Sequence, residues 1–166
     1  MDAAPYDIRL ATAADSAGLR AIKRTLTNPD GAPRRRSFTD AIDRGELLVV
    51  ARRVRDGGQA VDAYIEWHSR VDGMVTIREI GSEGEEPNNS HVKRLVRELL
   101  RMASPPLATL KVDRDAKVWN QLLAEVGGFR LEGQEYSRPR YRNIWSWTPA
   151  TEAEDRQRAL RSAPRR

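Results

Sequence analysis

Three strand-like segments joined by very short turns constrain the fold of this chain more than any other feature. Residues 47–54 and 60–71 are separated by Asp56-Gly57-Gly58, and Asp72-Gly73 leads on into residues 74–80. Gly-Gly and Asp-Gly pairs favour the tight reversals that join neighbouring antiparallel strands. The sequence therefore predicts a three-stranded antiparallel meander at the centre of the fold.

The middle segment of this meander alternates between two kinds of residue. One predicted face carries Val61, Ala63, Ile65 and Trp67, and the other carries Asp62, Tyr64, Glu66 and His68. Successive side chains of a strand point to opposite faces. The alternation indicates a strand with one face in the core and the other partly in water.

Before the meander the signals predict one strand and two helices. Residues 6–11 read as a strand, and Thr12 with Asp15 forms a capping pair for a helix that extends to the turn at 28–31. A second helix is predicted from Ser37, and Gly45 ends it.

After the meander the predicted elements alternate between helix and strand. They are a loop over 81–89, a helix over 90–102, a strand over 107–112, a helix capped by Asp113 or Asp115 that ends at Gly127-Gly128, and a hairpin of residues 129–135 and 141–147. Residues 148–166 form a basic tail, in which Thr151 and Glu154 mark the start of a short helix.

This order, β-α-α-β-β-β-α-β-α-β-β, resembles that of the GNAT (N-acetyltransferase) superfamily. Ile8–Asp15 (IRLATAAD) is similar to the first strand and helix start of many members, and Leu122–Arg130 (LLAEVGGFR) to their helix-to-Gly-Phe transition. The resemblance covers about residues 6–147. It implies an α/β fold with a mixed, mostly antiparallel central sheet flanked by helices, a GNAT-like domain over 1–147 and a separate tail over 148–166.

The resemblance also implies a site for acetyl-CoA. Segments 74–80 and 107–112 should lie parallel and splay apart, leaving the slot for the cofactor. Main-chain N–H groups at the start of the next helix should face its pyrophosphate. The cofactor-binding residues implied in this way are Ile80, Ser82, Asn89, Ser90 and Lys93.

The sequence departs from the family pattern at this loop. Alignment on Leu99-Leu100 puts Pro87 where an Arg or Gln belongs, and Ser90 and Val92 where small residues belong. Glu83, Glu85 and Glu86 bring three carboxylates to the expected anion site, and they should repel a diphosphate. We therefore expect acetyl-CoA as cofactor if the chain is active, bound weakly, and no cofactor if it is not.

The residues expected to perform the chemistry are also altered. The family's tyrosine acid should lie just before the Gly-Phe pair, where this chain has Leu122, Leu123 and Ala124; Trp119, one turn earlier, is predicted to be core. Candidate bases are Glu66 and Glu79, with His68 as a third, although polar residues on a half-exposed sheet face are also ordinary. An N-acyltransferase and a non-catalytic GNAT-derived binding module, for example in a phage particle, both remain open.

Composition narrows the partners. The 166 residues contain no cysteine and two distant histidines, His68 and His91, so no metal site is predicted. No apolar run approaches the roughly 20 residues of a membrane span, and Met1–Pro5 lack the features of a secretory signal. A cytoplasmic location, or one inside a particle assembled in the cytosol, is expected.

The net charge of +5 is compatible with an anionic partner. The 24 acidic residues are interleaved with the 29 basic ones, however, and this favours the alternative that the charges only contact water. A protein partner is predicted to bind the Tyr136–Arg166 region, where Tyr136, Tyr141, Trp145 and Trp147 lie close in sequence to many arginines. The other basic groups, Arg34-Arg35-Arg36 and the face of the 90–102 helix, leave nucleic acid as a second class of partner.

Overall fold

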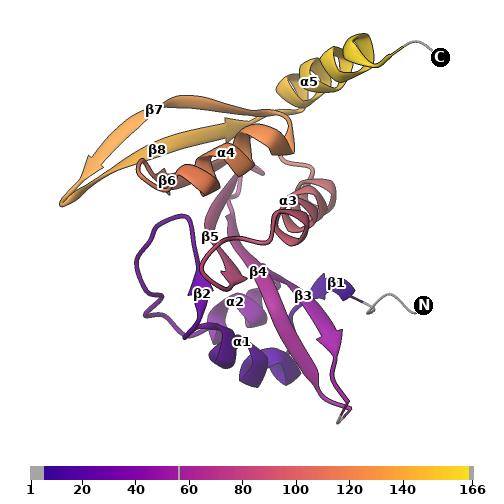
Figure 1. Cartoon of the computed structure of the whole chain (residues 1–166), viewed down its shortest axis with the longest axis vertical. Helices are drawn as coiled ribbons and strands as arrows, with labels where there is room; N and C mark the ends of the chain where they lie inside the picture. The colour runs from indigo at the N-terminus through magenta and orange to yellow at the C-terminus, as the bar shows by residue number, and fades with distance from the viewer. Residues whose placement is uncertain (1–5, 56, 165–166) are drawn as a thin grey trace.

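The structure is a computed structural model that describes residues 6–55 and 57–164; Met1–Pro5, Asp56, Arg165 and Arg166, all named above, lie outside the described residues. Within these ranges the strands form one eight-stranded sheet, ordered β1-β3-β4-β5-β6-β8-β7 with β2 paired to β5 (Figure 1). The elements are β1 (Tyr6–Leu10), η1 (Ala13–Asp15), α1 (Ser16–Ile22), β2 (Leu26–Thr27), α2 (Thr39–Arg44), β3 (Leu47–Arg53), β4 (Gln59–Ser69), β5 (Val75–Glu83), α3 (Asn89–Ala103), β6 (Ala108–Asp113), α4 (Lys117–Val126), β7 (Phe129–Ser137), β8 (Arg140–Trp147) and α5 (Pro149–Ser162).

The sheet separates two apolar cores. On one face α1 and α2 bury Leu19, Ile22 and Ala41 against Val49 and Tyr64. On the other face α3 and α4 bury a larger cluster that includes Val92, Leu95, Val96, Leu99, Leu122 and Leu123, and Trp145 and Trp147 belong to it. The buried residues of α3 recur at three- and four-residue spacing, which places them on one face of the helix.

Local capping chemistry explains several element boundaries. The Thr12–Asp15 capping box is present, with the Thr12 N–H 2.8 Å from an Asp15 carboxylate oxygen. Gly45 ends α2 at φ +67°, a left-handed conformation that glycine adopts without a Cβ clash. These predicted boundaries are confirmed, although α2 begins at Thr39, two residues after Ser37.

The predicted alternation of β4 is wrong at its start. Val61 packs in the core of α1 and α2 together with Tyr64, whereas Ala63 and Ile65 belong to the opposite core. The cause is a bulge: Val50 pairs with Ala63 and Ala51 with Val61, so Asp62 has no partner on β3. One extra residue in a strand reverses the face of everything beyond it.

Strands β5 and β6 are parallel neighbours, as predicted. Their pairing extends only from Val75↔Ala108 to Ile77↔Leu110. Immediately beyond it, the register of β4 with β5 skips Arg78, since Glu66 pairs with Glu79 and Trp67 with Ile77. The two strands therefore part at a bulge and leave the β6-facing edge of β5 open from Arg78 onward.

Three further boundaries differ from the sequence expectation. Helix α1 ends at Ile22, so Leu26, expected on the helix, lies in β2 instead. Strand β5 continues through Ser82 to Glu83, which were expected in a loop. Helix α4 begins after Ala116 without a side-chain cap, because an Asp113 carboxylate oxygen accepts the Asp115 N–H (2.9 Å) instead of capping the helix.

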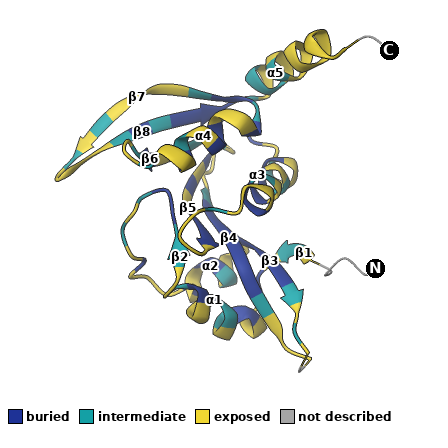
Figure 2. Cartoon of the chain, in the orientation of Figure 1, coloured by how far each residue is buried: buried dark blue, intermediate teal, exposed yellow. Residues whose placement is uncertain are grey.

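The C-terminal tail is a 14-residue helix that projects from the end of the sheet (Figure 1). Its cap is Thr148, whose hydroxyl accepts the Thr151 N–H at 3.2 Å, so the helix starts earlier than the Thr151–Glu154 signal predicted. No residue of α5 is buried, and most of it is fully exposed (Figure 2). Among the described helices, none has the length and apolar character needed to cross a lipid bilayer.

Candidate functional site

A cavity of about 610 Å³ lies where the parting strands meet the segment between β2 and α2. Residues 76–79 of β5 and 109–111 of β6 line one side, with Arg142 and Ile144 from β8, and residues between 28 and 36 line the other. Its volume is in the range of small-molecule sites. The strand bulge and the β2–α2 segment thus create the site together.

Arg34 is the central residue beside this cavity. Its Nη1 lies 2.8 Å from an Oε of Glu66 and also hydrogen-bonds Glu79, while its side chain is only 3% exposed. The guanidinium also donates to the Arg36 and Ser37 carbonyls at 2.9 and 3.0 Å and lies 4.0 Å from the centre of the Phe38 ring. The two carboxylates, neighbours across β4 and β5, are therefore joined by one buried cation.

The two predicted bases Glu66 and Glu79 are brought together, and His68 is not. Glu79 lines the cavity, whereas Glu66 is 1% exposed behind it and also accepts a 3.3 Å hydrogen bond from Arg36. The His68 Nδ1 lies 3.7 Å from Glu46, outside the cavity. A general base needs a free oxygen to accept a proton from its substrate. Here an oxygen of each glutamate is hydrogen-bonded to Arg34 instead.

Tyr64 lies under the same network. Its ring is fully buried opposite Gly81, where a Cβ would come within 2.3 Å of the ring. Burial, followed by the charge of Glu79, raises the pKa of the Tyr64 hydroxyl far above its usual value. The hydroxyl has no hydrogen-bond partner among residues 6–55 and 57–164, so Tyr64 is a neutral buried phenol.

The N-terminus of α3 is capped by Asn88. The Asn88 side chain accepts the His91 N–H at 3.0 Å, and its own N–H donates to the buried Ser82 hydroxyl at 2.9 Å. The N–H groups of Asn89 and Ser90 have no acceptor within the described parts of the chain. Those two groups are what this helix offers to an anion.

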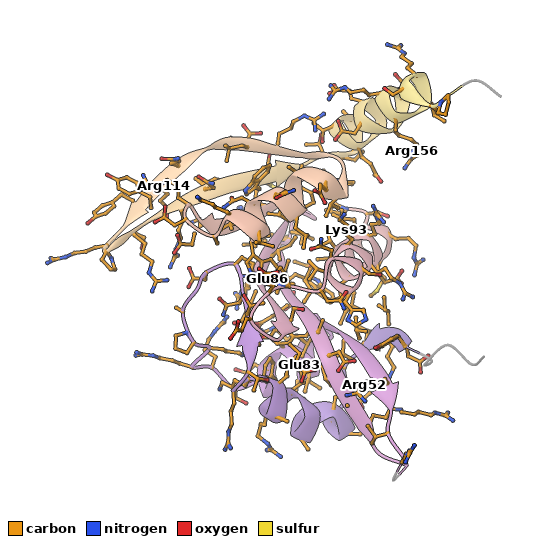
Figure 3. The ribbon with its side chains drawn as sticks, viewed as in Figure 1. Arg52, Glu83, Glu86, Lys93, Arg114 and Arg156 are labelled. Carbon is orange, nitrogen blue, oxygen red and sulfur yellow. The ribbon has the colours of Figure 1, made fainter. Side chains whose placement is uncertain are left out.

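The other residues assigned to cofactor binding are placed differently. Ile80 is fully buried in the core, and Lys93 forms a 3.0 Å ion pair with Glu125 of α4. Figure 3 shows Lys93 on α3 and Glu86 in the loop before it. Val92, aligned with a small residue of the cradle, points into the core instead, and it does not obstruct the loop. Binding of a cofactor by these residues stays a prediction.

Strand β2 occupies part of the open edge of β5. Leu26 and Thr27 pair with Glu83 and Ser82, and Ser82 also pairs with Ala63 of β4 on its other edge. A strand has two edges, so β2 lies on the edge that faces β6. The Gly84 N–H adds a 3.0 Å hydrogen bond to the Thr25 carbonyl.

The chain beyond β2 then connects to the opposite arm of the splay. The Trp119 indole donates to the Thr27 hydroxyl at 3.1 Å, and the Asp113 N–H to the Pro29 carbonyl at 2.9 Å. Asp30 pairs with Arg142 of β8 at 2.9 Å. We call residues 25–30 the strap, because they bond to β5 on one side and to β6, α4 and β8 on the other.

The position of the family's tyrosine acid supplies no proton donor. Leu122 and Leu123 are buried, Ala124 is exposed, and Trp119 is core as predicted, with its indole N–H engaged by the strap. Across the described residues, no group of three or more histidine or carboxylate side chains is arranged to hold a metal ion.

Sequence reasoning missed Arg34 and the strap. Arg34 was grouped with Arg35 and Arg36 as a surface basic run, yet it is buried and they are exposed. Its one local signal is Phe38, four residues on, which the guanidinium covers. The strap carries no strand signal longer than Leu26-Thr27, so only the long-range contacts define it.

Comparison with known proteins identifies the fold. No family model matches the sequence, and no curated protein is significantly similar to it. Solved structures do match. A GNAT-family acetyltransferase from Bacillus cereus aligns over 87% of this chain and 97% of its own, with a TM-score of 0.66 and 12% identity.

Two other structures give the same result. The ribosomal-protein-alanine N-acetyltransferase of Brucella melitensis aligns over 86% of this chain and 99% of its own (TM-score 0.64, 18% identity). A Bacillus anthracis protein with an inferred streptothricin acetyltransferase activity, solved with acetyl coenzyme A, aligns over 87% and 98% (TM-score 0.66, 11% identity). The chain has the GNAT fold, and the predicted mixed, mostly antiparallel sheet flanked by helices is confirmed.

Proposed function

We propose that this GNAT-fold chain is a non-catalytic binding module whose acetyl-CoA slot is closed by the strap. The observation that carries the proposal is the pairing of Leu26 and Thr27 with Glu83 and Ser82 on the open edge of β5. In the GNAT layout the splay between these strands is the slot for the cofactor. The paired main chain of β2 occupies this edge at Ser82 and Glu83, so a cofactor cannot pair with β5 at those two residues.

The loop before α3 supports the same conclusion. Glu85 and Glu86 are exposed in the loop that leads to the helix N-terminus, where their charge opposes a diphosphate, whereas Glu83 lies in β5. Pro87 supplies neither an N–H group nor a cation. The loop therefore combines repulsion with a reduced set of donors.

The chemistry of the site also supports a binding role. Glu66 and Glu79 share the buried Arg34, and Leu122, Leu123 and Ala124 cannot protonate a leaving thiolate. An acyl transfer needs a base for the acceptor amine and gains from an acid for the thiolate. This chain retains carboxylates at the cavity, but no acid at the family's position.

Calorimetric titration with acetyl-CoA tests the proposal. We expect a dissociation constant no tighter than high micromolar to millimolar, or about −4 to −6 kcal/mol. Adenosine 3′,5′-bisphosphate serves as the control for attraction by surface arginines alone, and it should bind about as well as acetyl-CoA. Submicromolar binding of acetyl-CoA, with the bisphosphate far weaker, would overturn the proposal.

One observation favours N-acyl transfer as the second candidate function. The unbonded N–H groups of Asn89 and Ser90 at α3 remain available to an anion, and Glu79 faces the cavity. Incubation with acetyl-CoA and a panel of amines, followed by mass spectrometry, tests it. Turnover that Glu79→Gln abolishes and Glu132→Gln preserves, at an exposed β7 position, would establish it.

We propose that the macromolecular partner of this module binds the β7–β8 hairpin and α5. Tyr136 and Tyr141 are 59% and 45% exposed, and their rings contact each other at a tilt of 49° with their centres 5.0 Å apart. Trp145 and Trp147, which were predicted to belong to the partner-binding region, are core residues and cannot contact a partner there. The exposed arginines of α5, among them Arg156 (Figure 3), lie at the other end of the hairpin, where α5 follows Trp147 (Figure 1). A protein partner, within a larger assembly, is the class that such a Tyr- and Arg-rich surface favours.

A further inference from the structure

The cavity described above has a marked excess of positive charge. Its lining contains six basic side chains and two carboxylates. The basic ones are Arg34, Arg35, Arg36, Arg78, Lys111 and Arg142, and the acidic ones are Asp30 and Glu79. A small-molecule cavity of this composition concentrates anions, because the protein walls screen its charges less than water does.

Some of these cations are already neutralised. Arg34 is committed to Glu66 and Glu79, and the Lys111 Nζ lies 2.9 Å from Glu135 of β7. Arg36 reaches Glu66 at 3.3 Å. These residues therefore contribute little net attraction to a ligand.

The remaining cations keep donors free. Arg35 and Arg78 form no ion pair with any residue of 6–55 or 57–164. Arg142 pairs with Asp30 through Nη2 (2.9 Å), while its Nε is buried and has no acceptor within the same ranges. A buried, unbonded guanidinium N–H is costly unless a ligand or water accepts from it. The free donors come from two strands, β5 and β8, and from the segment between β2 and α2, around one cavity.

The uncharged part of the lining combines apolar residues with three polar ones, Asn28, Thr76 and Thr109. Among the apolar residues, Ile77 and Leu110 are only 2% exposed, whereas Pro33 is exposed and Ala32 and Ile144 are half-buried. A hydrated inorganic ion would leave Ala32, Pro33 and Ile144 in contact with water. A ligand with an apolar part would cover them.

We propose that this cavity binds a small organic anion. Its carboxylate or phosphate oxygens accept hydrogen bonds from Arg78, Arg35 and the Nε of Arg142, and its apolar part covers Pro33 and Ile144. Arginine suits this role because its planar fork of donors matches either oxyanion. The inference rests on the lining of the cavity and not on acyl transfer, and it is tested with small anions in the absence of acetyl-CoA.

Titrations with three probes of one size test the charge preference. Phenyl phosphate and benzoate carry the two oxyanions, and benzylamine carries a cation on the same ring. We expect both anions, or one of them, to bind at least tenfold more tightly than benzylamine by calorimetry or NMR shift titration. The tighter anion identifies the ligand as a phosphate or a carboxylate. Equal or tighter binding of benzylamine would overturn the proposal.

Variants locate the binding. Arg78→Gln removes an exposed cavity arginine, and Arg94→Gln removes an exposed arginine of α3 that is not in the lining. We expect Arg78→Gln to weaken the better anion at least tenfold and Arg94→Gln to change its affinity by less than twofold. Should Arg78→Gln lower the melting temperature, Arg35→Gln, outside every strand and helix, replaces it with the same expectation. Equal effects of cavity and α3 variants would overturn the site.

A single-stranded oligonucleotide distinguishes the small ligand from a polyanion. We expect it not to displace phenyl phosphate or benzoate from the cavity. Displacement, together with an equal loss of oligonucleotide affinity in Arg78→Gln and Arg94→Gln, would show a nucleic-acid surface in place of a small-molecule site.

Discussion

This molecule has two networks of arginine and carboxylate side chains that differ in how far they are exposed to water. Arg34 joins Glu66 and Glu79 with 3% of its side chain exposed. Arg130 binds Asp155 of α5 through two hydrogen bonds of 2.7 and 2.8 Å, with 33% of its side chain exposed. The bonds differ in geometry, since Arg34 reaches both glutamates through Nη1 alone, whereas Arg130 uses two nitrogens for the two oxygens of Asp155. Only at Asp155 can water replace a lost partner. The comparison teaches that the exposure of an ion pair weighs more than its geometry in what its loss costs, because the pair with the forked geometry is the one expected to cost less.

The largest effect is expected from Arg34→Met. Removal of the guanidinium leaves two carboxylates in the interior without a cation, and such changes cost about 3–5 kcal/mol of unfolding free energy. Urea denaturation at neutral pH measures the loss. Arg35→Met, at the exposed neighbouring residue, should change stability by less than about 0.5 kcal/mol. Equal effects of the two variants would contradict the buried network.

Replacing the whole network should be milder than breaking it. The triple variant Arg34→Met, Glu66→Leu, Glu79→Leu leaves no buried charge of this network without its partner. We therefore expect it to regain most of the stability that Arg34→Met alone loses. The same urea titration measures it. A triple variant no more stable than Arg34→Met would mean that hydrogen bonds from Arg34 to the Arg36 and Ser37 carbonyls, not charge pairing, carry the energy.

A smaller effect is expected at the surface pair. Hydrogen bonds from Arg130, then from the Gly128 N–H, lower the pKa of Asp155 from 3.8 to about 2. A lowered pKa in the folded state means that this contribution is complete above about pH 4 and is lost as pH falls through about 2. Asp155→Asn should cost about 1 kcal/mol or less at neutral pH.

The location of that effect can be measured. Hydrogen exchange should speed up in α5 of Asp155→Asn and stay unchanged in β4 and β5. Glu154→Gln is the matched control, since Glu154 lies farther from Arg130 (3.4 Å) and is more exposed. Faster exchange throughout the sheet would show that α5 supports the whole fold.

Deleting residues 148–166 should cost at least as much stability as Asp155→Asn, because it removes the Asp155 contacts together with the Thr151–Gly128 hydrogen bond. No residue of α5 is buried, so the truncated chain should fold with its melting temperature only slightly lowered. The truncated protein should nevertheless fail to enter its native complex in a pull-down from the source organism. If it retains every partner of the full chain, the tail is a solvated appendage.

Local signals in the sequence predicted local features well. Thr12 with Asp15, Gly45 and the Gly127-Gly128 pair mark ends of helices because each acts on its own backbone. The parallel pairing of β5 and β6 was also predicted, through the resemblance in element order. The face of Val61 was not, since the bulge at Asp62 depends on pairing with β3.

The candidate site was predicted only in part. Glu66 and Glu79 were named because they are polar residues on neighbouring strands, and their register brings them together. Arg34 could not be separated from Arg35 and Arg36, because burial of one arginine in a run is decided by partners more than 30 residues away. Pairing of Leu26 with Glu83 lies equally beyond any local pattern.

The strap also has a consequence for the order of folding. Its bonds join residues far apart in the chain: Thr27 and Trp119 are 92 positions apart, and Asp30 and Arg140, joined at 2.8 Å, are 110 apart. Closing loops of that length costs chain entropy before any contact compensates for it. The meander of β3, β4 and β5, built from adjacent segments, can form first, and the strap can close only after β6, α4 and β8 have assembled. During folding the gap between β5 and β6 is therefore open, and the strap bridges it only after those elements have assembled.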